Sequence, residues 1–206
     1  MRMDDIRPES RFWQEHLLFL GRFVRSPRAV GAIAPSSRRL ACRMVEGLEL
    51  TAAARIAELG PGTGSFTAEI AARLPPDGRC LAVDRDEAFV ARLRARWPRV
   101  ECVAGRAERL VALAEARGLS PFDHVVSGLP FASLPAATTC LILDAIHDTL
   151  GPGGTFTTFQ YVHAFPLPPA AAFRRAMTAR MGTGPARSLV VGNLPPAFVL
   201  RWRRAA

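Results

Sequence analysis

An acid and three alternating glycines form the part of this chain best suited to chemistry. Residues 57–67 read Ala-Glu-Leu-Gly-Pro-Gly-Thr-Gly-Ser-Phe-Thr, an apolar run that ends near Glu58 and continues into Gly60, Gly62 and Gly64. Glycines let the backbone turn tightly and approach a ligand with no Cβ in between, and the helix that follows presents free N–H groups. We therefore expect these four residues to hold an adenosine-bearing cofactor.

A second acid falls where a ribose-binding carboxylate is expected. The next apolar run ends in Asp84, about 20 residues beyond the glycines, and βαβ units place the carboxylate that accepts the ribose hydroxyls at this spacing. The alternative is that Asp84 caps the helix beginning near Asp86. Asp86 is itself a favoured cap, so we assign Asp84, with Arg85 beside it, to the cofactor.

The spacing of the glycines separates two cofactor classes. Nicotinamide and flavin sites use Gly-x-Gly-x-x-Gly, whereas this chain has Glu-x-Gly-x-Gly-x-Gly. This order resembles the first motif of class I S-adenosylmethionine-dependent methyltransferases. The resemblance implies S-adenosylmethionine as cofactor and S-adenosylhomocysteine as product. It also places Ala107 and Glu108 against the adenine, although Arg106 stands where this family usually has an acid.

The elements that position these residues alternate along the chain. We predict strands over 55–59, 79–84, 99–103, 122–127 and 155–161, and helices over 87–96, 107–117, 135–150 and 169–181. The last two strands, 187–191 and 197–203, are too close for a crossover helix and should form an antiparallel hairpin. We expect an α/β, Rossmann-like class I methyltransferase fold: a seven-stranded, mostly parallel sheet with one antiparallel strand and helices on both faces.

The composition indicates a globular, basic protein. Of 206 residues 49% are hydrophobic and 22% are charged, the net charge is +9, and all 27 basic residues are arginine. The choice of arginine over lysine fits a codon bias, but the sign of the charge favours a polyanionic partner, nucleic acid or an anionic membrane. The four separated cysteines predict no metal site. No segment is typical of a signal peptide or a membrane span, so we expect a cytoplasmic protein.

The N-terminal residues predict a basic amphipathic helix. In residues 9–25 aromatic and aliphatic side chains recur at helical spacing and are flanked by arginines. Such a helix either covers its own domain or lies in a membrane interface. We expect the second, with Phe19 covering the cofactor unless it packs in the core. Residues 1–50 would form this helical extension and residues 51–206 the catalytic domain.

Several motifs carry a closer resemblance. Residues 25–37, Arg-Ser-Pro-Arg-Ala-Val-Gly-Ala-Ile-Ala-Pro-Ser-Ser, closely resemble the N-terminal signature of bacterial phospholipid N-methyltransferases, and the likeness continues through the glycine loop, 127–131, 159–161 and 193–198. That family methylates phosphatidylethanolamine to its mono-, di- and trimethylated forms, the last being phosphatidylcholine. The resemblance implies the same activity here. We expect a monomer, attached through its N-terminal helix to the anionic inner face of the cytoplasmic membrane.

The related rRNA adenine dimethyltransferases provide the alternative function. They usually carry Asn-Leu/Ile-Pro-Tyr where this chain has Gly128-Leu-Pro-Phe131, and their Asn helps to hold the exocyclic amine of a flipped adenine. Gly128 lacks that amide, so we expect no nucleic-acid substrate. A third possibility is a binding module with a relic cofactor fold.

Methyl transfer to an amine requires a positioned, uncharged nucleophile. A lipid ethanolamine titrates between about 8 and 10, so most of it is protonated near neutrality. We expect carbonyl oxygens around Ser127 and Gly128 to orient the amine, with Ser127 also at the cofactor, and the rings of Phe131 and Tyr161 to offer π-faces to it. Tyr161 orients the substrate unless it is a core tyrosine. His163 relays the proton unless it lies in a surface loop.

Overall fold

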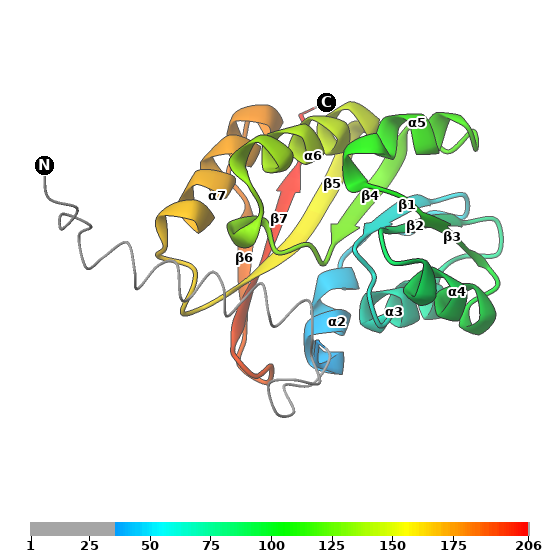
Figure 1. Cartoon of the computed structure of the whole chain (residues 1–206), viewed down its shortest axis with the longest axis horizontal. Helices are drawn as coiled ribbons and strands as arrows, with labels where there is room; N and C mark the ends of the chain where they lie inside the picture. The colour runs from blue at the N-terminus through cyan, green and yellow to red at the C-terminus, as the bar shows by residue number, and fades with distance from the viewer. Residues whose placement is uncertain (1–35, 206) are drawn as a thin grey trace, which may run out of the picture.

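Seven strands form one sheet in residues 36–205, the part of the chain that this computed structural model describes. Their order is β3-β2-β1-β4-β5-β7-β6, and only β7 runs against its neighbours (Figure 1). The bounds are β1 Arg55–Leu59, β2 Arg79–Asp84, β3 Val100–Ala104, β4 Phe122–Ser127, β5 Leu150–Tyr161, β6 Ala186–Val190 and β7 Ala197–Arg203. The expected sheet, with its closing antiparallel hairpin, is confirmed.

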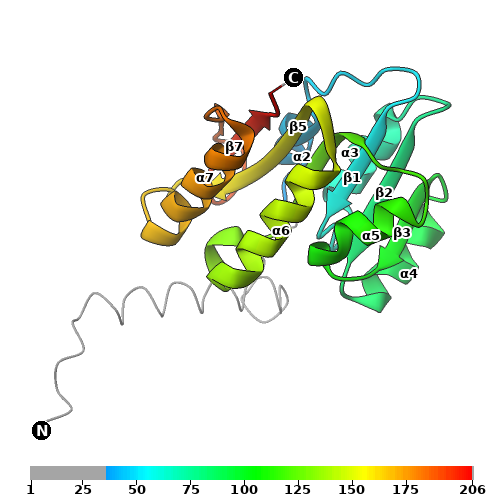
Figure 2. The same cartoon turned by 90° about the horizontal axis from the view of Figure 1, so that it is seen from above.

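Helices cover both faces of the sheet, as Figures 1 and 2 show. One face carries α2 (Arg38–Val45), α3 (Ser65–Arg73) and α4 (Glu87–Arg96); the other carries α5 (Leu110–Glu115), α6 (Ala136–Thr149) and α7 (Pro168–Met181). Short 3₁₀ helices at Ala107–Arg109 and Phe131–Ser133 precede α5 and α6. Because side chains alternate along a strand, Ile56 packs toward α2–α4 and Ala57 toward α5–α7. The result is two buried cores, one on each side of the sheet.

β5 begins earlier than the sequence predicts. We expected a turn at residues 151–154, but this segment continues β5 back to Leu150, which pairs with Phe122. The pairing register shifts between Phe122 and His124, and Gly153 has a φ of 70°, so the glycines accommodate a bulge. The predicted helix over 107–117 also divides into a 3₁₀ turn and the short α5.

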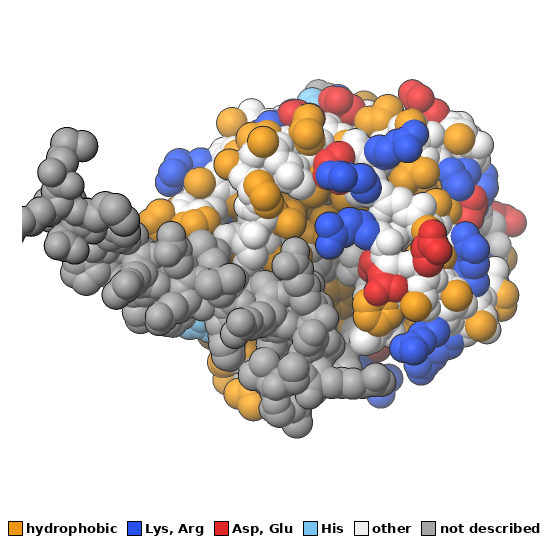
Figure 3. All heavy atoms as spheres, viewed as in Figure 1, with side chains coloured by type: hydrophobic (Ala, Val, Ile, Leu, Met, Phe, Trp, Pro, Cys, Tyr) orange, Lys and Arg blue, Asp and Glu red, His pale blue; other side chains and the backbone are white. Residues whose placement is uncertain are grey.

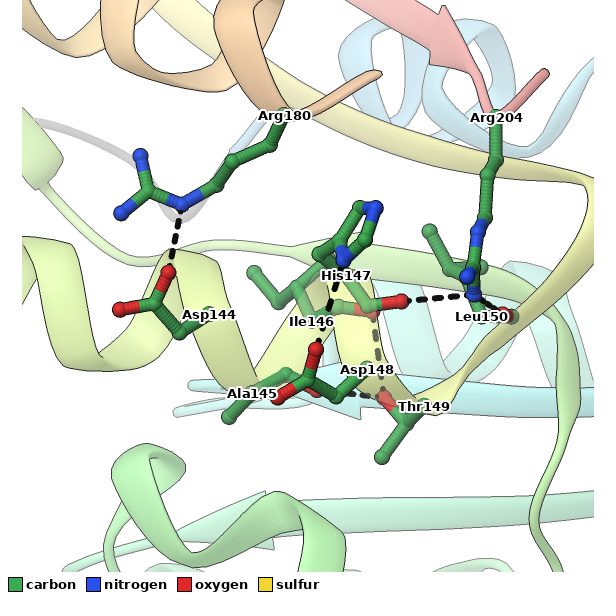
Figure 4. Close-up of polar contacts among 9 residues, drawn as sticks. All are labelled: Asp144, Ala145, Ile146, His147, Asp148, Thr149, Leu150, Arg180 and Arg204. Atoms are coloured by element: carbon green, nitrogen blue, oxygen red, sulfur yellow. Dashed lines mark hydrogen bonds and ion pairs between the residues drawn. The ribbon is translucent and has the colours of Figure 1, made fainter.

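Contacts among α6, α7 and the end of β7 close the amino edge of the sheet. Arg180 on α7 pairs with Asp144 on α6 at 2.8 Å. Arg204, which follows β7, donates to the carbonyl oxygen of His147 at 2.9 Å and also to that of Leu150 (Figure 4). Leu150 begins β5, so this network lies at the opposite edge from the strand ends where the glycine loop starts.

The turn of the β6–β7 hairpin is tied to the start of α2. The buried Asn193 side chain accepts the Ser37 N–H at 2.9 Å and donates to the Pro195 carbonyl at 2.7 Å. Ser37 in turn caps α2, because its hydroxyl accepts the N–H of Leu40 at 3.2 Å. α2 is thereby fixed to the sheet at its N-cap and packs through Met44 into the same core as α3.

No helix within residues 36–205 combines the length and the apolar character needed to cross a bilayer. The predicted amphipathic helix of residues 9–25, with Phe19, lies outside the described residues. Its role as a membrane anchor and cofactor cover, and the domain boundary after residue 50, stay predictions.

Replacing Asn193 by alanine is expected to lower the free energy of unfolding by about 1 to 3 kcal/mol, because the Ser37 N–H and the Pro195 carbonyl lose their partner. Urea unfolding measures the change. Asp77→Ala, in an exposed turn, is the control and should alter stability by less than about 0.5 kcal/mol. Equal effects of the two variants would show that Asn193 does not secure the hairpin.

Candidate functional site

The order of the strands reverses between β1 and β4, and sheets of this kind bind ligands at the carboxyl ends of the strands at that point. The loops that follow these two strands touch. A Cβ on Gly128 would lie 2.8 Å from the carbonyl oxygen of Gly60, and a Cβ on Gly60 would lie 2.7 Å from the Leu129 side chain. Glycine at both positions therefore allows the two loops to meet over the switch point.

The glycine loop takes the left-handed conformation that its sequence predicts. Gly60, Gly62 and Gly64 have φ angles of 69°, 53° and 86°. A Cβ on Gly64 would meet the Trp97 ring at 2.4 Å, so this glycine lets α3 approach the end of α4. Among the residues that the structure describes, a Cβ on Gly62 would meet nothing within 4 Å. The middle of the loop thus borders open space, where a ligand can approach its backbone.

Asp84 fastens the glycine loop to the end of β2. Its carboxylate accepts the Gly62 N–H at 2.9 Å and the Asp86 N–H at 3.0 Å. Asp86 is the cap of α4, since its own carboxylate accepts the N–H groups of Ala88 and Phe89 at 2.8 and 3.2 Å. Asp84 is therefore not needed as a cap. Its half-buried carboxylate retains capacity to accept further hydrogen bonds.

Glu58 is a fully buried carboxylate beneath the loop. One oxygen, Oε2, accepts the Thr67 hydroxyl at 2.7 Å, whereas Oε1 has no hydrogen-bond partner among the described residues. Burial raises the pKa of Glu58 to about 7, against the opposing effect of its hydrogen bonds from Thr67. Thr67 lies on α3 and was not among the predicted site residues. Its place in the first turn of the helix after the glycine loop could have indicated that it lies near Glu58.

The expected adenine-contacting residues lie at the end of β3. Ala107 is buried at the start of the 3₁₀ turn, and Glu108 forms an ion pair with Arg106 at 2.7 Å. Partial burial opposes ionisation of Glu108, but the hydrogen bond from Arg106 lowers its pKa overall, with a smaller contribution from the charge of Arg85. The structure thus brings Arg85 and Glu108 to the same edge as Asp84, because β2 and β3 are parallel neighbours.

Ser127 and Phe131 face inward. The hydroxyl of the fully buried Ser127 accepts the Leu129 N–H at 3.2 Å, and its carbonyl oxygen accepts the Thr158 hydroxyl at 3.0 Å. Phe131 is buried, with its ring stacked on Phe173 of α7 at 4.4 Å between centroids. In this structure Ser127 shapes the loop, and the π-face expected of Phe131 is covered by core packing.

A row of four aromatic rings connects the glycine loop with the end of β5. Phe66 meets Phe159 edge to face at 5.9 Å, Phe159 meets Tyr161 at 5.4 Å, and Tyr161 stacks on His163 at 5.7 Å with an interplanar angle of 8°. Burial raises the pKa of Tyr161. Phe66 and Phe159 were not among the predicted site residues. Phe159 could have been predicted, because residues 159 and 161 lie on the same face of one strand.

The site fits an adenosine cofactor with a charged methionine part. The orphaned Oε1 of Glu58 is a buried acceptor, the Asp84 carboxylate has free acceptor capacity, and open space borders Gly62. All three lie at the carboxyl edge of β1 and β2.

Glu58→Gln is expected to remove a pH dependence of stability. The folded state holds the proton of Glu58 up to about pH 7, whereas the unfolded chain releases it near 4.5. The stabilising contribution is therefore present below 4.5 and lost as the pH rises through 7. Between pH 5 and pH 8 the free energy of unfolding should fall by about 2 to 3 kcal/mol more in the wild type than in Glu58→Gln.

Urea unfolding at a series of pH values measures this difference. Glu115→Gln, an exposed carboxylate on α5, is the matched control and should follow the wild-type profile. Parallel profiles for wild type and Glu58→Gln would contradict the raised pKa.

Comparison with known proteins agrees with this geometry. A family model described as a methyltransferase domain matches residues 56–154. The chain is 35% identical over 146 residues to an ornithine lipid N-methyltransferase of Singulisphaera acidiphila, which covers 69% of this chain and 76% of that protein.

Solved structures share the fold. An O-methyltransferase of Streptomyces achromogenes, TomG, in complex with S-adenosylmethionine superposes with a TM-score of 0.62 at 22% identity, covering 92% of this chain and 90% of that one. A 1,6-didemethyltoxoflavin-N1-methyltransferase of Burkholderia thailandensis, with S-adenosylhomocysteine bound, has a TM-score of 0.61 at 19% identity and covers 100% and 94%. S-Adenosylmethionine is the cofactor. The chain belongs to the class I S-adenosylmethionine-dependent methyltransferases, in the family that includes the Singulisphaera enzyme.

Proposed function

We propose that this protein transfers methyl groups from S-adenosylmethionine to the primary amine of phosphatidylethanolamine at a membrane surface. The observation that carries a lipid amine as acceptor is the 35% identity to an ornithine lipid N-methyltransferase. Ethanolamine and ornithine both contain a primary amine, so a lipid with an ornithine headgroup is the second candidate. The resemblance of residues 127–131 and 193–198 to phospholipid N-methyltransferases supports ethanolamine.

The cofactor supplies an electrophilic methyl group on its sulfonium. In this proposal the orphaned oxygen of Glu58 accepts a hydrogen bond from the ammonium group of the cofactor, which removes the cost of leaving a buried acceptor unpaired. Asp84 accepts the ribose hydroxyls while it continues to hold Gly62. Ala107 and Glu108 border the adenine, where the ion pair with Arg106 keeps Glu108 ionised.

The amine is oriented by the end of the aromatic row. Because burial raises the pKa of Tyr161, its phenol keeps its proton near neutrality and serves as a hydrogen-bonding group rather than as a base. His163, stacked on it at 5.7 Å, is the residue we assign to accept the proton that the ammonium must lose. The π-face of Tyr161 tolerates an amine that gains methyl groups and ends as a quaternary cation.

The loop after β4 weighs against an adenine acceptor. The rRNA adenine dimethyltransferases usually place an Asn side chain at the position of Gly128. Here a Cβ would already lie 2.8 Å from the backbone oxygen of Gly60, a contact that side chains essentially never make. With these loop positions the chain has no room for the amide that would hold an adenine amine.

Asp84→Asn is expected to weaken the binding of S-adenosylhomocysteine by about 10- to 100-fold, because hydrogen bonds to an ionised acceptor contribute about 1.5 to 3 kcal/mol. Isothermal titration calorimetry measures the dissociation constant. Asp86→Asn, two residues away, is the matched control: asparagine is also a good helix cap, so binding should change less than about twofold. Equal weakening by both substitutions would argue against a ribose role for Asp84.

The acceptor is tested by methyl transfer from labelled S-adenosylmethionine to three substrates in parallel. These are vesicles containing phosphatidylethanolamine, vesicles containing an ornithine lipid, and rRNA. We expect label in mono- and dimethylated ethanolamine lipid, at a rate at least about tenfold above the other two acceptors. Label confined to ornithine lipid would show that the acceptor is a lipid amine but that its headgroup is ornithine and not ethanolamine. Label in rRNA alone, from protein that binds cofactor, would refute the proposal.

A further inference from the structure

Four of the five exposed large hydrophobic side chains of residues 36–205 gather at one place. The five are Leu141, Val162, Leu189, Val191 and Leu194. Three belong to the β6–β7 hairpin, and their exposed fraction rises toward its turn, from 50% at Leu189 to 70% at Val191 and 83% at Leu194. Val162 lies beside them, because its N–H donates to the Pro196 carbonyl in the turn at 2.9 Å. We call Val162, Leu189, Val191 and Leu194 the hairpin patch.

The hairpin patch lies at the edge of the sheet that carries the site. β6 pairs with the antiparallel β7 and therefore runs parallel to β5, so its turn falls at the carboxyl edge. Val162 directly follows Tyr161 and precedes His163, the two residues at the end of the aromatic row. A surface that covers the patch therefore also adjoins the end of β5, where the amine is expected.

A basic groove adjoins the hairpin patch. It has a volume of about 600 Å³ and lies between α2 and the end of β6, with Arg38, Arg39 and Arg43 on its α2 side. Arg38 and Arg43 pair with Glu69 and Glu46, whereas no carboxylate pairs with Arg39 among the described residues. The Arg39 side chain lies against Gly192, where a Cβ would meet it at 2.5 Å. The excess of positive charge therefore stands beside the exposed apolar turn.

This arrangement differs from the α4 side of the molecule, where acidic and basic side chains are interspersed (Figure 3). Apolar side chains on a firmly held turn, beside arginines in excess over acids, match the two layers of a bilayer surface: acyl chains inside and anionic phosphates above them. A second copy of the protein would carry the same positive groove and would not neutralise it.

We propose that the hairpin patch docks on an anionic membrane, with its apolar side chains in the boundary between headgroups and acyl chains and with Arg38, Arg39 and Arg43 on lipid phosphates. The proposal rests on the proposed lipid activity, since docking there sets the aromatic row against the headgroups. It assigns membrane contact to the folded domain itself, in addition to the N-terminal segment.

Tryptophan probes in the full chain test the docking. Leu194→Trp should be quenched by vesicles of phosphatidylethanolamine and phosphatidylglycerol with brominated acyl chains, at least about twofold more than Leu141→Trp. Leu141 is the matched control, because it is 58% exposed but lies on α6. Both variants keep the native tryptophans, so their difference reports the contrast between positions 194 and 141. Equal quenching would overturn the proposal.

Loss of the patch gives the second measurement. The double variant Val191→Asp, Leu194→Asp should partition onto the same vesicles about tenfold more weakly than the wild type. Leu141→Asp should partition like the wild type, because only the double variant loses apolar surface that docking would bury. Both positions are exposed, so folding should persist, as circular dichroism would check. Unchanged partition would contradict the docking. A wild-type dimer that the double variant converts to monomer, without vesicles, would identify a contact between copies instead.

Neither measurement depends on catalysis. If the wild type methylates none of the lipids but the quenching contrast is present, the docking holds and the proposed function fails. If methylation occurs and the contrast is absent, the function holds and the docking surface is wrong.

Discussion

The meeting of two loops over the switch point governs the rest of the site. β1 and β4 are neighbours and parallel, so the loops that leave them compete for the same space. Glycine at positions 60 and 128 resolves the competition, since a Cβ on Gly128 would come within 2.8 Å of the Gly60 backbone oxygen. The glycine loop is then free to bend toward Asp84, and the chain after β4 turns inward to bury Phe131. The loop after β1 and the loop after β4 thereby share one border.

The buried Glu58 carboxylate destabilises the folded protein by itself. Desolvation of a carboxylate is unfavourable, and Thr67 satisfies only one of its oxygens. The fold places this acid near the carboxyl end of the central strand β1. A buried carboxylate is tolerable there if a bound ligand supplies a hydrogen-bond donor. If the position were purely structural, an apolar side chain would be more stable. The buried acid is thus more easily understood as part of a binding site than as part of the core.

The sequence predicted what local patterns determine. β1, β2, β4 and α4 have the predicted bounds, because apolar runs define the three strands and the capping residue Asp86 defines the start of α4. The start of β5 was missed, since Gly-Pro-Gly-Gly is a turn signal in isolation and becomes a bulged strand only beside β4. The positions of Glu58, Asp84 and the glycines at the carboxyl edge followed from their spacing, and their roles in binding stay predictions. The burial of Ser127 and Phe131 did not follow from spacing, because it depends on Thr158 and Phe173, which arrive from distant segments.

The antiparallel direction of β7 places the C-terminal end of this strand at the amino edge of the sheet, opposite the edge that carries the glycine loop. A parallel last strand would have carried the chain back to the edge that holds the glycine loop. β7 instead carries it to Arg204, which is fastened beside the start of β5 at the amino edge. A purification tag or fluorescent reporter joined after residue 204 would therefore leave from the side away from the glycine loop, whereas an insertion into the turn between β6 and β7 would stand at the edge that carries it.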